Sequence, residues 1–314
     1  MRTGHGLPFV CTLYMQLILE GIVARVQRDL KVIINHFVWM ANHAHIIVEA
    51  RDAQQCTRFY GEVQKQLTEA VKRLLGREHL SLWRSNETSV MHLGDRESVM
   101  RRIAYLYANP ARAGLVNAIE QYPGVSSWSG FQSVAADLKA TISKECPWVQ
   151  APMIPRLPAR SVTERQDLRL YAMMRERVRH KHELKLQPNS WMERFGVTTT
   201  QEIGQVNRSI IAMVREHEEA ARVERQSMNR KVVGVNKLRR EPLTMDYRPK
   251  RDTRRLFVHA EDKALRIQMI KRYKDFCDRC RECYERWKLG DFTVVWPPGA
   301  FRPPQPSNAN WYGP

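Results

Sequence analysis

The chain has 314 residues, which is enough for one large domain or two ordinary ones, and its hydrophobic fraction of 43% is typical of a globular protein with a core. Six cysteines are too few for a disulfide framework, and no apolar run reaches the roughly 18–20 residues that a membrane-spanning helix needs. The formal net charge of +18 instead favours a polyanionic partner.

The first part of the chain predicts a helix, a hairpin and a second helix. Apolar residues recur at helical spacing over residues 8–26. Residues 32–38 are rich in β-branched and aromatic side chains, and residues 43–49 predict a second strand after a short connection, so we expect a hairpin. Residues 53–75 form an amphipathic pattern that Gly76 ends.

The next elements complete an α+β pattern. Residues 80–91 predict a short strand or an extended stretch, and residues 96–108 predict another amphipathic helix. We expect this helix to end at Asn109, because the residue before a proline is disfavoured in the α region. Two helices packed on a small antiparallel sheet predict an α+β domain over residues 1–131.

The composition changes after this domain. We expect a proline-rich linker over residues 132–160, a basic, mainly helical extension over 161–290 and a proline-rich tail over 291–314. Within the extension, residues 164–185, 201–230 and 262–287 predict helices, and residues 232–252 predict a basic loop. In the last helix, Cys277, Cys280 and Cys283 are spaced to share one face; this interpretation is favoured over a metal site because no fourth ligand is evident.

His43 and His45 are the sharpest chemical signal. Alternate residues of a strand point to the same face, so two imidazoles could bind one divalent cation. The alternative is a pair of histidines on the solvated face of an edge strand. His36 is a weaker candidate, and we expect it to be structural.

Tyr105 and Asn109 are the second signal. They are four residues apart and therefore lie on one helix face. There the tyrosine could attack a phosphodiester that a metal polarises, and the asparagine oxygen could complete the metal site. Tyr107 lies on another face and is a poor alternative nucleophile. The competing interpretation is that both tyrosines pack in the core and that Asn109 merely ends the helix.

Together, these stretches resemble a known family. Residues 39–48, WMANHAHIIV, resemble the M-P-N-H-x-H-hydrophobic signature of single-tyrosine HUH transposases, and residues 105–116, YLYANPARAGLV, resemble their Y-x-x-x-N-P-x-x-A-G-L-V signature. Residues 122–128, YPGVSSW, are similar to a segment of the REP-associated tyrosine transposases, and the resemblance covers residues 5–131. Ala41 stands where the signature has proline, and little sequence precedes a segment that normally follows the family's first strand.

The resemblance implies a ferredoxin-like HUH domain that cuts and rejoins single-stranded or hairpin DNA. It implies that His43, His45 and Asn109 bind Mg²⁺ or Mn²⁺. It also implies that Tyr105 attacks the scissile phosphate to give a 5′-phosphotyrosine and a free 3′-hydroxyl. Reversal of this step with another 3′-hydroxyl would rejoin strands without ATP.

DNA contacts are expected from basic side chains outside this set, and the alternative is that the charge of the extension is only a solvated surface. The residues expected to bind DNA are Arg112, Lys237, Arg239, Arg240 and Arg251. We expect a cytoplasmic protein, nucleoid-associated when bound to DNA, with monomer and homodimer both open. The competing functions are a domesticated, non-catalytic hairpin-binding protein and a replication or mobilisation initiator; no phosphate-binding G-x-x-x-x-G-K-[ST] loop supports the latter.

Overall fold

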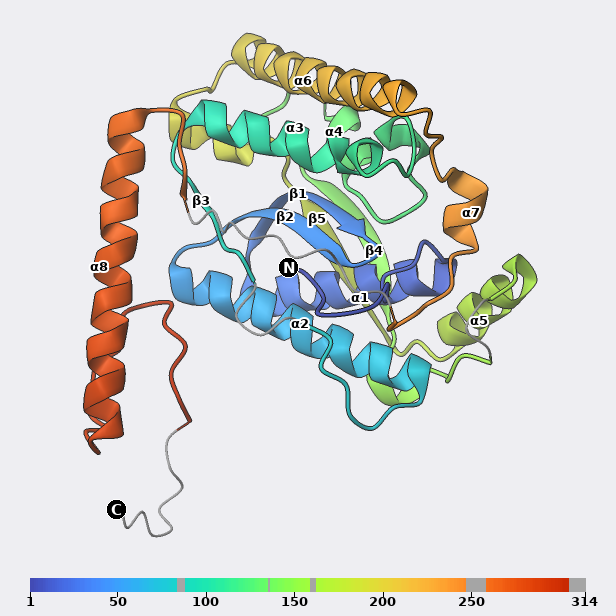
Figure 1. Ribbon diagram of the computed structural model, residues 1–314, viewed down its shortest axis with the longest axis horizontal. Coiled ribbons are helices and arrows are strands. Elements are labelled where there is room, and N and C mark those ends of the chain that lie inside the picture. Colours follow the sequence, from blue (N-terminus) through green and yellow to red (C-terminus); the bar gives the residue numbers. More distant parts are fainter. Residues whose placement is uncertain (84–87, 135, 159–161, 247–257, 305–314) are drawn as a thin grey trace.

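The computed structural model describes residues 1–83, 88–134, 136–158, 162–246 and 258–304. Its centre is a mixed four-stranded sheet in the order β2-β1-β5-β4 (Figure 1). Strands β1 (Ile33–Met40) and β2 (His43–Glu49) form the expected antiparallel hairpin. Strands β4 (Ile142–Trp148) and β5 (His180–Leu186) form a second antiparallel pair, and β5 joins β1 in parallel. The fold is therefore α+β with a mixed sheet.

Helices cover both faces of the sheet (Figure 1). One face of the sheet packs against helices α1 (Leu13–Leu30) and α2 (Ala53–Leu75), and a first apolar cluster is buried between them. The other face packs against helices α3 (Arg96–Arg112), α4 (Trp128–Ser133) and α6 (Thr200–Ser227) and buries a second cluster. The remaining elements are α5 (Glu164–Glu176), α7 (Val235–Arg239), α8 (Lys263–Lys288), the two-residue strands β3 (His92–Leu93) and β6 (Val258–His259), and the 3₁₀ turns Ile119–Gln121, Ala151–Met153 and Ser190–Phe195.

Local sequence explains where the two helices beside the hairpin begin and end. The Asp52 carboxylate accepts a hydrogen bond from the Gln55 amide at 2.7 Å at the start of α2, and Gly76 ends the helix with a left-handed φ of 62°. The predicted bounds of α2 are confirmed. Helix α3 starts with the same type of cap at Asp95, but the prediction that it ends at Asn109 is wrong, because Pro110 continues in helical conformation and the helix extends to Arg112. A proline removes one backbone donor, and the packing of this face on α6 and β1 outweighs that loss.

Other predicted elements also differ from the structure. The helix expected over residues 8–26 is observed at Leu13–Leu30, and the basic loop expected over residues 232–252 contains α7. The stretch expected to be extended includes residues 84–87, which lie outside the described residues, and its nearest strand is β3, which begins after it. The expected linker instead contains the whole of β4, in which Pro147 pairs with Lys181 on an edge strand that tolerates proline. The helix expected over residues 164–185 ends at Glu176, and β5 follows. In β5, His182, Leu184 and Leu186 are buried alternately, which is the two-residue period of a strand.

The sheet thus crosses the boundaries expected at residues 131 and 160. Strand β5, from the expected extension, lies between β1 and β4, and helix α6 packs against α3. The helices predicted over residues 201–230 and 262–287 are confirmed as α6 and α8, within one or two residues at most ends.

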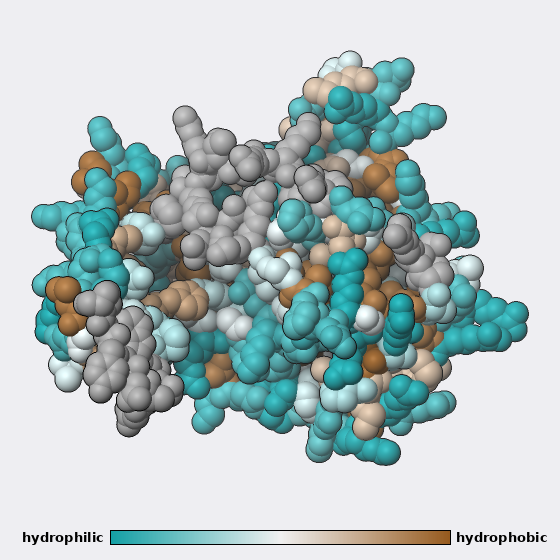
Figure 2. Space-filling model, turned by 60° about the horizontal axis from the view of Figure 1, so that its bottom comes forward, coloured by the Kyte–Doolittle hydropathy of each residue, from teal (hydrophilic) through white to brown (hydrophobic). Residues whose placement is uncertain are grey.

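Hydrophilic side chains predominate on the face in Figure 2, and the apolar ones form small separate areas. Over the described residues, no helix is both long and apolar enough to cross a membrane.

Candidate functional site

The β1–β2 hairpin positions the two histidines of the predicted site. His45 pairs with Val38 and His43 with Met40, so both imidazoles project from the same face of β2, while Ala44 between them is buried in the core. The centroids of the two rings are 5.0 Å apart, and the rings are nearly perpendicular. The strand alternation expected from the sequence is therefore confirmed.

Helix α3 brings Tyr105 to the histidines. The centroid of its ring is 5.8 Å from that of His45, although the two residues are 60 positions apart in the chain. The guanidinium carbons of Arg112 and Arg102 lie 5.0 Å and 5.8 Å from the Tyr105 ring. The aromatic ring is thus bordered by an imidazole and two cationic groups.

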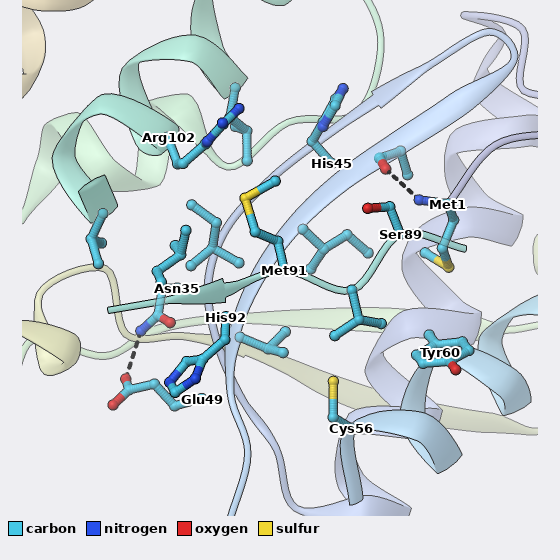
Figure 3. Close-up of a pocket in the computed structure, with 18 of the residues that line it drawn as sticks. Met1, Asn35, His45, Glu49, Cys56, Tyr60, Ser89, Met91, His92 and Arg102 are labelled. Carbon is cyan, nitrogen blue, oxygen red and sulfur yellow. Dashed lines mark hydrogen bonds between the residues drawn. The ribbon is translucent and has the colours of Figure 1, made fainter. Parts of the chain in front are cut away.

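His43, His45, Arg102 and Tyr105 line one pocket of about 670 Å³ that also includes Asn109. Figure 3 shows His45 from β2 and Arg102 from α3 at one end of this pocket, and Cys56 and Tyr60 from α2 at the other. Asn109 is 8% exposed, and its side-chain nitrogen is buried without a hydrogen-bond partner. A buried N–H donor without a partner is unusual in a folded protein and would be satisfied by a hydrogen-bond acceptor, whereas a cation could bind only the amide oxygen.

The two imidazoles are neutral at physiological pH. Burial, followed by the positive charge of Arg2, lowers the pKa of His43 to about 4. Burial also lowers the pKa of His45 to about 3, and the charges of His43, Arg102 and Arg2 act in the same direction. Neutral imidazoles retain the ring lone pair that coordinates a metal.

A hydrogen bond also orients one of the rings. Nδ1 of His43 lies 2.8 Å from Oδ1 of Asn42; because the amide oxygen can only accept, Nδ1 donates and Nε2 keeps its lone pair. Two neutral imidazoles and the buried Asn109 amide therefore fit a divalent cation in their donor chemistry. Within the described ranges, no cluster of three or more His, Cys, Asp or Glu side chains could hold a metal, so the amide would have to serve as the third protein ligand.

His36 and Tyr107 belong to the core, as expected. Both are fully buried, and the Tyr107 hydroxyl lies 2.8 Å from Nδ1 of His36 and 2.9 Å from the hydroxyl of Ser127. Nε2 of His36 donates to the carbonyl of Pro188 at 3.0 Å. Tyr107 is therefore shielded from substrate by the protein interior, and its ring stacks on Phe131.

The residues expected to bind DNA are not gathered in one place. Arg112 is exposed and lies against Tyr105, and Lys237, Arg239 and Arg240 belong to α7 or its end. None of these four residues lines the pocket. Arg251 lies outside the described residues. Separately, the three cysteines of the C-x-x-C-x-x-C run, Cys277, Cys280 and Cys283, lie on α8 and are free thiols.

Arg2 and Arg102 also line this pocket and were not predicted as site residues. Arg102 lies three positions before Tyr105, so helical spacing could have identified it. Arg2 carries no such signal, because only its pairing with His43 of β2 places it at the site.

Comparisons with known protein families, with curated proteins and with solved structures found no match to this chain.

Proposed function

We propose that this chain is a metal-dependent, single-tyrosine DNA transesterase of the HUH type, similar to the REP-associated tyrosine transposases. The observation that carries the proposal is the juxtaposition of Tyr105 with the His43–His45 pair: the ring centroids of Tyr105 and His45 are 5.8 Å apart, and those of His43 and His45 are 5.0 Å apart. These are the residues on which the two family signatures converge, and they come from a strand and a helix that are distant in sequence. A ferredoxin-like arrangement of the domain is part of the same proposal.

In this mechanism His43, His45 and Asn109 would hold Mg²⁺ or Mn²⁺. The cation would neutralise non-bridging oxygens of the scissile phosphate and orient it. The Tyr105 oxygen forms a bond to phosphorus, and the bond from phosphorus to the 3′ oxygen breaks. The hydroxyl proton of Tyr105 leaves, and the departing 3′ oxygen gains a proton. The products are a 5′-phosphotyrosine and a 3′-hydroxyl, and reversal with another 3′-hydroxyl rejoins strands.

The position of Tyr105 suits a nucleophile better than that of Tyr107. Tyr105 is half-buried in the pocket wall, and among the described residues its hydroxyl has no hydrogen-bond partner. A hydroxyl without an internal partner is available to a substrate. The hydroxyl of Tyr107 is already engaged by two buried groups.

The test is formation of a covalent adduct. The protein is incubated with single-stranded DNA from the flanks of its own gene and Mg²⁺ or Mn²⁺, and denaturing electrophoresis then detects a protein–DNA species. We expect the adduct with wild-type protein and none with Tyr105→Phe or with EDTA. Tight DNA binding without an adduct under any metal condition would contradict the proposal and favour the non-catalytic hairpin-binding protein.

A further inference from the structure

Two half-buried arginines at the pocket each have a buried side-chain donor without a partner. Nε of Arg2 and Nε of Arg102 are both buried and without a hydrogen-bond partner. Among the described residues, no carboxylate forms an ion pair with either guanidinium. The neighbouring Arg101 differs, because its side chain is 62% exposed and lies 3.6 Å from the Glu261 carboxylate.

The fold brings the two arginines together from distant parts of the chain. Arg2 is held opposite His43 by an isolated antiparallel bridge, and the adjacent Thr3 amide donates to the Asn42 carbonyl at 2.9 Å. Arg102 lies one helical turn before Tyr105 on α3 and faces the pocket (Figure 3). Arg2 and Arg102 thus line the same pocket as His43 and His45.

The charge of the pocket is not balanced. Arg2, Arg102 and Arg194 line the pocket, and Glu49 is its single acidic lining residue among those described. The Glu49 carboxylate already accepts hydrogen bonds from Asn35 at 2.8 Å and from Ser190 at 2.6 Å. Burial also lowers the pKa of the Arg102 guanidinium, which nevertheless stays charged at neutral pH. Buried N–H donors without a hydrogen-bond partner are costly, so an anionic ligand that accepts from them would be stabilising.

We propose that Arg2 and Arg102 form a binding subsite for a phosphodiester of single-stranded DNA, beside Tyr105. Guanidinium groups present paired donors that match phosphate oxygens, and a single-stranded chain carries one such anion per nucleotide. The inference rests on the proposed function in one respect, that the bound phosphate is the one that Tyr105 attacks. In that arrangement the two arginines bind non-bridging oxygens of the phosphate close to the His43–His45 pair.

The experiment observes the arginines directly, without cleavage. Tyr105→Phe protein is labelled with ¹⁵N, and the Nε–H resonances of Arg2 and Arg102 are assigned from the variants Arg2→Gln and Arg102→Gln. The protein is then titrated with a 15-nucleotide oligo-dT in EDTA. We expect both resonances to shift at saturation. We also expect each variant to weaken oligo-dT binding by about 10- to 100-fold, since a hydrogen bond to a charged group contributes roughly 1.5–3 kcal/mol.

Matched variants distinguish binding at the subsite from a general effect of positive charge on DNA affinity. Arg101→Gln removes one positive charge from the same helix turn and should leave the affinity within about twofold, because Arg101 is exposed and paired. Arg102→Lys, which keeps the charge, should preserve the salt dependence. Arg102→Gln should reduce the slope of log affinity against log salt by about 0.7, the value for one phosphate contact on a single strand.

The outcomes distinguish this inference from the proposed function. Unchanged Nε–H resonances at saturating oligo-dT, or equal affinities for Arg101→Gln and Arg102→Gln, would overturn the subsite even if wild-type protein forms the covalent adduct. Shifted resonances together with a complete absence of adduct would support the subsite and contradict the transesterase.

Discussion

Replacing each of two nearby tyrosines by phenylalanine should separate catalysis from stability. Tyr107→Phe removes a fully buried hydroxyl that bonds His36 at 2.8 Å and Ser127 at 2.9 Å. Tyr105→Phe removes a hydroxyl that has no hydrogen-bond partner among the described residues. Both substitutions delete a tyrosine hydroxyl, and the two positions are two residues apart on α3, so each variant is the control for the other.

The structure gives the size of the effect. Without the Tyr107 hydroxyl, Nδ1 of His36 is left buried and unsatisfied, which costs about 1–3 kcal/mol. Ser127 loses less, because its hydroxyl oxygen also accepts from the Phe37 amide at 2.8 Å and donates to the Phe37 carbonyl at 3.3 Å. We therefore expect Tyr107→Phe to lower the free energy of unfolding by about 2–3 kcal/mol. For Tyr105→Phe the expected change is below about 0.5 kcal/mol.

The assays are urea unfolding followed by tryptophan fluorescence, and covalent adduct formation on single-stranded DNA under conditions where both variants are folded. Tyr105→Phe should unfold like wild type and form no adduct, whereas Tyr107→Phe should be less stable and still form it. The reverse result, an adduct with Tyr105→Phe and none with folded Tyr107→Phe, would refute the assignment of the nucleophile. Equal stability of all three proteins would refute the hydrogen-bond network around His36.

Three further outcomes follow from the same geometry. His43→Ala or His45→Ala should abolish the adduct and weaken Mn²⁺ binding, measured by calorimetry, by more than about 10-fold. Asn109→Ala should have a milder effect, because water can replace a neutral oxygen ligand. Unchanged Mn²⁺ affinity in the double histidine variant would exclude the metal site. Burial lowers the pKa of His36 to about 3, so below pH 6.5 the unfolded state binds more protons than the folded state, and stability decreases as the pH is lowered. This residue alone should lower the free energy of unfolding by about 2 kcal/mol at pH 5. His36→Gln should therefore flatten the pH dependence of urea unfolding. Truncation after Gln150 should give protein without a cooperative unfolding transition, because it removes β5 from between β1 and β4; a folded, active fragment would contradict the shared sheet.

The sequence by itself determined the elements whose signals are local. The amphipathic pattern of α2 and its Gly76 stop predicted the observed bounds, since a helix face repeats every 3.6 residues and a left-handed glycine ends it. The alternation around His43 and His45 likewise predicted that both imidazoles share a face of β2. The direction of the Tyr107 side chain also followed from helical spacing.

Only the tertiary structure decided how distant segments meet. Strand β5 has an exposed face of charged side chains, and it becomes a central strand because its buried alternate residues complete the sheet beside β1. This pairing is stabilised by contacts between strands that are more than 130 residues apart in the sequence, so a short stretch of sequence cannot predict it. The same holds for Pro110, where packing outweighs the local preference for a helix end. It holds for Arg2 as well, which reaches the pocket through one bridge to His43, so that the cationic end of the site exists only in the folded chain.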